Sequence, residues 1–113
     1  MINVLIKKKD NQIINLKVTG HANSDVYGKD LVCAGVSTAS IGVLNMLVKK
    51  GFLANHLGKI EIDEGYINIV VDHKDDVCQV VLETLETTFE TMVEDYGQFI
   101  KLSLIHISEP TRL

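Results

Sequence analysis

Hydrophobic and polar residues alternate along the start of this chain with the period of a β-strand. Residues 2–8 and 13–19 both show this alternation, and the polar stretch 9–12 between them favours a turn. Residues 59–64 and 66–72 are two further short strand-like runs around the turn sequence Asp63-Glu64-Gly65. The pattern therefore predicts two β-hairpins, and residues 99–104 predict one more strand.

Two longer segments have helical features. The first runs from about Leu31 to Lys50, with Asp30 expected as its cap and Gly51 at its end. In the second, which we expect to begin at a cap on Asp75 or Asp76, apolar residues recur at positions i, i+3 and i+4. Acidic residues are expected to cover its outer, solvent-facing side: Glu83, Glu86, Glu90 and Glu94.

The element order is therefore ββαββαβ. Two helices that each need a sheet to cover their apolar side predict an α+β fold, a two-layer sandwich with a mainly antiparallel sheet covered by two helices. Residues 1–102 are expected to form the single domain. The string from Ser103 to Arg112 resembles a translated sequencing-library adapter, so we expect 103–113 to be a non-native or disordered tail, without a role for His106.

Composition and charge narrow the class of protein. The 113 residues carry a net charge of −4, which favours a basic partner and argues against direct binding of nucleic acid. Two cysteines are too few for a disulfide scaffold and fit a reducing cytoplasm. Residues 31–48 carry no charge, yet the polar side chains among them favour a helix buried by the sheet and a second subunit over a membrane span.

A cysteine near a helix start and a histidine after a strand are the main candidates for chemistry. Cys33 is expected to be the third residue of the first helix, where the helix dipole favours a thiolate. His21 ends the second strand, and the loop that contains Gly28 can return its ring to Cys33 as a base. A packed, inert cysteine and a solvated loop histidine are the structural alternatives for this pair.

The other candidates are weaker. Asp30 can be a helix cap alone or can orient His21, and Ser37 lies one helical turn beyond Cys33. Cys78 also follows an aspartate by three residues, but it continues an apolar stripe, so we expect an inert thiol. The sequence lacks a zinc-ligand spacing and a phosphate-binding loop, so we expect neither a metal site nor a cofactor.

Three short motifs together are similar to those of a known family. Gly20-His21-Ala22, Tyr27-Gly28 and the stretch Asp30-Leu31-Val32-Cys33-Ala34-Gly35-Val36-Ser37 resemble the signature of the bacterial ribosomal-processing cysteine proteases, the Prp family. The resemblance implies a cytoplasmic homodimer that removes the N-terminal extension of large-subunit ribosomal protein 27. It also implies a catalytic dyad of His21 and Cys33, supporting roles for Asp30 and Ser37, and a mobile loop, for which we expect Gly20 and Gly28 as hinges.

Two other functions remain open at this point. One is a non-enzymatic acidic binding module or chaperone for a basic ribosomal protein. The other is a thiol redox sensor, in which Cys33 cycles through a sulfenic acid. Only the protease shortens its partner, so the mass of the partner after incubation separates these alternatives.

Overall fold

The elements follow the predicted order. The structure, a computed structural model, describes residues 1–20 and 29–107. Both hairpins and both helices lie where the sequence predicts them, with ends that differ by one or two residues. The elements are β1 (Ile2–Lys9), β2 (Gln12–Thr19), α1 (Lys29–Lys49), β3 (Gly58–Asp63), β4 (Tyr66–Val71), α2 (Asp76–Tyr96) and β5 (Ile100–Ile107).

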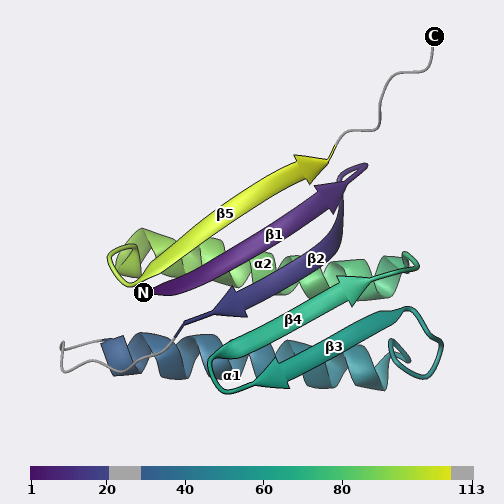
Figure 1. Cartoon of the computed structure of the whole chain (residues 1–113), viewed down its shortest axis with the longest axis horizontal. Helices are drawn as coiled ribbons and strands as arrows, with labels where there is room; N and C mark the ends of the chain where they lie inside the picture. The colour runs from purple at the N-terminus through teal and green to yellow at the C-terminus, as the bar shows by residue number, and fades with distance from the viewer. Residues whose placement is uncertain (21–28, 108–113) are drawn as a thin grey trace, which may run out of the picture.

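The five strands form one sheet in the order β3-β4-β2-β1-β5. Hairpin partners pair antiparallel, as does β2 with β4, whereas β5 pairs parallel with β1. Figure 1 shows α1 and α2 side by side behind the sheet, so one sheet face is covered by helices and the other is not. The predicted α+β two-layer sandwich is confirmed.

The core lies between the sheet and the two helices. Alternate residues of β1 point into it, since Ile2, Val4 and Ile6 are at most 2% exposed. From the helices come side chains such as Leu47 of α1 and Phe89 of α2, both fully buried. The core fixes which face of each strand is inward, and therefore which side chains are left on the open face.

Helix α1 begins earlier than the sequence predicted. It starts at Lys29, so Asp30 is its second residue and not its cap, and Cys33 is its fifth residue, not its third. Residues 31–49 are long and apolar enough for a membrane span, with a mean hydropathy of 1.9. A core helix of this fold passes the same test, because its inner side must be apolar: Val32, Val36, Leu44 and Leu47 are buried.

Helix α2 has the expected cap at Asp75, whose carboxylate accepts a hydrogen bond of 3.0 Å from the backbone N–H of Cys78. The prediction that Glu86 lies on the outer face is wrong. Glu86 is 5% exposed, and its carboxylate lies 2.8 Å from the ammonium of Lys8 on β1. Its charge is tolerated there because the sheet supplies a cation, which the pattern of α2 alone does not contain.

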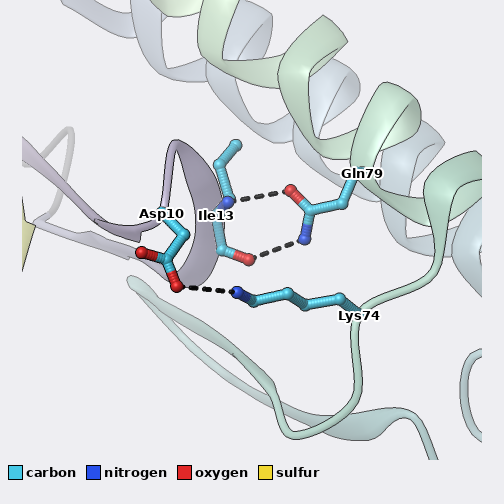
Figure 2. A network of polar contacts seen from close by, with 4 residues as sticks. All are labelled: Asp10, Ile13, Lys74 and Gln79. Atoms are coloured by element: carbon cyan, nitrogen blue, oxygen red, sulfur yellow. Dashed lines mark hydrogen bonds and ion pairs between the residues drawn. The ribbon is translucent and has the colours of Figure 1, made fainter.

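A side chain of α2 completes the hydrogen bonding of β2. The Gln79 amide accepts a bond of 2.8 Å from the Ile13 N–H and donates one of 2.8 Å to the Ile13 carbonyl oxygen (Figure 2). This contact lies beside the irregularity between Lys7 and Lys8, where the register of β1 and β2 shifts. Gln79 therefore satisfies the buried N–H and carbonyl groups of Ile13, which a neighbouring strand would otherwise pair.

The last strand is longer than predicted. β5 pairs with β1 from Ile100 to Ile107, so residues 103–107 are not disordered, contrary to our expectation for the tail. Pairing with β1, residue by residue up to Lys9, carries the strand beyond its predicted end. The remaining residues of the expected tail lie outside the described part of the chain, and a non-native origin of 103–113 stays a prediction.

Candidate active site

A cleft of about 160 Å³ lies between α1 and the β3–β4 hairpin. One wall is a stripe of α1, the opposite wall is the end of the hairpin, and the β1–β2 strands form the floor. From α1 it takes Cys33, Val36, Ser37 and Ile41; from the hairpin Ile62, Asp63, Gly65, Tyr66 and Ile67; and from the floor Ile2, Val18 and Gly20. The cleft is thus mostly apolar, with a thiol, a hydroxyl and a carboxylate among its lining groups.

Cys33 is partly buried and lies in this cleft. As the fifth residue of α1 it follows the first turn, whose N–H groups lack partners within the helix. Helical side chains lean toward the N-terminus, so its sulfur is directed back over that first turn. The thiol of Cys33 therefore lies close to the helix start, two residues further along the helix than the sequence suggested.

Ser37 lies in the same cleft, as its spacing from Cys33 predicts. Residues four apart on a helix share a face, and Cys33, Ser37 and Ile41 follow this spacing along one wall. Ser37 is exposed, so its hydroxyl is accessible to a molecule in the cleft. The structure thus brings the thiol and the hydroxyl of the motif to one site.

Gly20 closes one end of the cleft at the end of β2. Its N–H donates a hydrogen bond of 3.0 Å to the Gly65 carbonyl oxygen, which ties β2 to the turn between β3 and β4. Its φ of +124° is a conformation that residues with a Cβ rarely adopt, and a Cβ there would collide with the Met1 carbonyl oxygen. A glycine is required at this position by the local backbone.

The partners predicted for Cys33 on the connecting segment lie outside the described residues. These are His21 and Gly28, while Asp30 is described only as part of the α1 backbone. Gly20, which directly precedes residues 21–28, lines the cleft, and so does Cys33, four residues after Lys29.

Cys78 has the surroundings of an inert thiol. It is 2% exposed and packs in the core, and burial raises the pKa of its thiol, with Asp75 raising that pKa further. A raised pKa keeps the sulfur protonated and unreactive at neutral pH. Its environment is that of a structural residue, unlike that of Cys33.

A shared metal site is not visible in the part of the chain that the structure describes. Within residues 1–20 and 29–107, no three His, Cys, Asp or Glu side chains are grouped so as to hold an ion. His73 and Cys78 belong to no such group. The chemistry available in the cleft is that of a thiol, a hydroxyl and a carboxylate.

The sequence did not reveal the hairpin wall of the cleft. Asp63 and Tyr66 line it together with Cys33, although they are about thirty residues away in sequence. The turn between them was predicted, but its position opposite α1 follows from the strand order, in which β4 pairs with β2. The pattern of residues within one segment does not show which strands become neighbours in the sheet.

Comparisons with known proteins agree on one family. The profile of the family described as cysteine protease Prp matches residues 1–101. A Staphylococcus aureus protein named ribosomal processing cysteine protease Prp is 32% identical over 107 residues, covering 91% of this chain and 98% of the relative.

Two crystal structures of a ribosomal processing protease from Staphylococcus aureus have the same fold. The first, in complex with a substrate peptide, superposes with a TM-score of 0.77 at 29% identity, covering 92% of this chain and 99% of the other. The second, with a covalently linked product peptide, gives a TM-score of 0.75 at 30% identity and the same coverage.

Proposed function

This chain belongs to the cysteine protease Prp family, and from this premise we propose that it removes the N-terminal extension of bacterial large-subunit ribosomal protein 27. The match over residues 1–101 is the observation that carries the proposal. The cleft beside Cys33 supports it, because a partly exposed thiol there is accessible to a peptide. A relative that was crystallised with a substrate peptide supports the same ligand class.

In the proposed reaction, the Cys33 thiolate attacks the carbonyl carbon of the scissile peptide bond. The carbon–nitrogen bond breaks, His21 in its protonated form gives its proton to the departing amine, and the acyl group stays on sulfur. Neutral His21 then takes a proton from water, which hydrolyses the thioester and regenerates the thiol. A covalently linked product peptide in a relative supports a step through an enzyme-bound peptide.

Backbone N–H groups at the start of α1 are suited to stabilise the oxyanion of this reaction. The helix begins at Lys29, so its unpaired N–H groups lie in the turn over which the Cys33 side chain leans. Ser37, which lines the same wall of the cleft, would donate a further hydrogen bond. Asp30 would orient His21, and the segment between Gly20 and Gly28 would close over the bound peptide.

We further propose that residues 1–102 act as a cytoplasmic homodimer. Large apolar side chains remain exposed along α1, including Leu31 at 69% and Val48 at 51%, and a second copy would cover them. The small residues Ala34 and Gly35 line a groove between the helices with Leu31 and Met92, away from the Cys33 cleft. The two thiols fit a reducing compartment.

Family membership favours this enzyme over the acidic binding module. The test is incubation with the ribosomal precursor that carries its N-terminal extension, followed by measurement of intact mass. We expect a shortened product with the wild-type protein and none with Cys33→Ala, while both give the same circular dichroism spectrum. Cys78→Ala, the matched control, is expected to retain cleavage.

A precursor that keeps its full mass but co-purifies with the chain would contradict the protease and support the binding module. Cleavage by Cys33→Ala would exclude this residue as the nucleophile. Oxidation of Cys33 by peroxide, without any peptide cleavage by the reduced protein, would instead support the redox sensor.

A further inference from the structure

The sheet face that no helix covers collects the lysines of the strands. Both helices lie on the other side of the sheet (Figure 1), and the buried residues of each strand point toward them. The alternate residues therefore point to the open face. Its lysines are Lys7 on β1, Lys17 on β2, Lys59 on β3 and Lys101 on β5.

The register of the strands places these lysines in three neighbouring rows of paired residues across the sheet. One row of paired residues across the sheet runs Lys59, Val70, Asn15, Lys7, Ile105. The next row runs Glu61, Asn68, Lys17, Leu5, Ser103, and the third runs Asp63, Tyr66, Thr19, Asn3, Lys101. Lys17 lies one strand and one row from Lys7, and two strands and one row from both Lys59 and Lys101, so neighbouring lysines are about 8–12 Å apart at the usual strand separation and rise per residue.

Within residues 1–20 and 29–107, none of these four lysines forms an ion pair with a carboxylate. The ion pairs found among the described residues use Lys8 and Lys74, and neither of these lies on the open face rows. The two carboxylates in the rows, Glu61 and Asp63, both lie on the edge strand β3. The middle of the face, around Lys7 and Lys17, is therefore positively charged.

The negative charge of the chain is concentrated elsewhere. Helix α2 contains no lysine or arginine, and its acidic residues are Asp76, Glu83, Glu86, Glu90, Glu94 and Asp95. The net charge of −4 does not show this separation of acidic and basic residues, because it is summed over the sheet and the helices. Our expectation that the chain does not bind nucleic acid rested on that sum alone.

Polar and aromatic groups accompany the lysines. Tyr66 lies in the third row, with the Lys17 ammonium 6.0 Å from its ring centroid, which places both side chains on the same face. The amides of Asn15 and Asn68 lie between them and Lys7, joined by a hydrogen bond of 2.7 Å. A flat, open sheet with cations for phosphates, a ring for stacking and amides for base edges matches single-stranded RNA.

We propose that this open face, defined by Lys7, Lys17, Lys59, Lys101 and Tyr66, binds single-stranded RNA. The choice of RNA rests on the proposed function, since a ribosomal precursor is assembled on RNA. A basic ribosomal protein would be repelled by these lysines, and so would the same face of a second copy. Because Asp63 and Tyr66 also line the cleft, the RNA surface adjoins the site of cleavage.

The test measures the fluorescence anisotropy of a labelled oligouridylate of about 20 nucleotides, a length that covers several binding sites. We expect binding at low salt whose affinity falls as salt rises, with a log–log slope of about −2 to −3 for three to four phosphate contacts. The double variant Lys7→Glu/Lys17→Glu is expected to lose affinity at least about tenfold at low salt.

The matched control is Lys49→Glu/Lys50→Glu, at exposed positions at the end of α1. It changes the net charge equally but leaves the open face intact, so it should bind within about twofold of wild type. Equal losses in the two variants, absence of binding at low salt, or equally tight binding of an oligoglutamate of matched length would each overturn the proposal. Thermal melts confirm that both variants fold.

The assay contains no peptide and is repeated with Cys33→Ala, so it does not depend on cleavage. RNA binding by Cys33→Ala without cleavage by wild-type protein would refute the proposed protease function alone. Cleavage by wild-type protein without RNA binding would refute the RNA surface alone.

Discussion

The side chain of Gln79 takes the place of a strand neighbour for Ile13. Its amide both accepts from the N–H and donates to the carbonyl oxygen of that residue, at 2.8 Å in each case (Figure 2). These two bonds connect α2 to the sheet where the pairing of β1 and β2 becomes irregular. Gln79 is 5% exposed, so water does not readily replace it.

Gln79→Ala is therefore expected to destabilise the fold by about 2–4 kcal/mol, since it leaves two buried backbone groups without partners. Urea unfolding followed by circular dichroism measures this change. Gln79→Glu is a second variant, which can accept from the N–H but not donate to the carbonyl oxygen while ionised. An Ala variant as stable as wild type would show that another group satisfies Ile13.

Loss of Glu86 should be costly unless Lys8 is replaced as well. Glu86→Ala leaves the Lys8 ammonium in a mostly buried position, and we expect a loss of about 2–3 kcal/mol, because Lys8 keeps some contact with water. The double variant Lys8→Met/Glu86→Met is expected to recover most of that loss. Denaturant midpoints of Lys8→Met, Glu86→Met and the double variant give the coupling free energy between the two side chains. Additive losses would contradict a direct interaction.

The two cysteines are expected to differ in reactivity. Cys33 lies in the cleft, whereas Cys78 is buried and its thiol pKa is raised by burial and by Asp75. Iodoacetamide should therefore label Cys33 of the folded protein first, at neutral pH, and Cys78 only on opening of the core. Peptide mass mapping over time identifies the labelled residue, and earlier labelling of Cys78 would reverse the assignment.

Asp75 should make stability depend on pH in the acid range. Its hydrogen bond from the Cys78 N–H lowers the pKa of the carboxyl below its ordinary value. A lowered folded-state pKa gives stability that is present above the unfolded pKa and is lost as the pH falls through the folded one. We expect Asp75→Ala to lower the melting temperature at neutral pH, because the helix loses its cap.

Asp75→Asn keeps a cap oxygen without the charge, so it should retain most of the stability at neutral pH. Its melting temperature should also depend less on pH below about 4 than that of wild type. Parallel acid melts of the three proteins make the comparison. An unchanged acid dependence in Asp75→Asn would assign that dependence to other carboxylates.

Local patterns in the sequence determine most elements of this fold. The alternation in β1 and β2 and the helical spacing in α2 predicted all three elements to within two residues. Glu86 was misplaced because its partner, Lys8, lies on β1 and its burial depends on tertiary packing. The extension of β5 was missed for the same reason, since pairing with β1 rather than a local signal maintains it.

The candidate site could be predicted in part. The four-residue spacing of Cys33 and Ser37 placed them on one face, and the structure puts both in the cleft. The hairpin residues opposite them depend on strand order, as does the clustering of lysines on the open face. The dyad of His21 and Cys33 stays a prediction, because His21 lies outside the described residues.

The parallel pairing of β1 with β5 has a consequence for biosynthesis. Residues 2–9 find one of their two neighbours only in residues 100–107, which are translated long after them. Contacts so distant along the chain form late, after the intervening loop has been closed. A nascent copy therefore leaves one side of β1 unpaired until residues 100–107 have been translated, and a copy truncated before them exposes that side permanently.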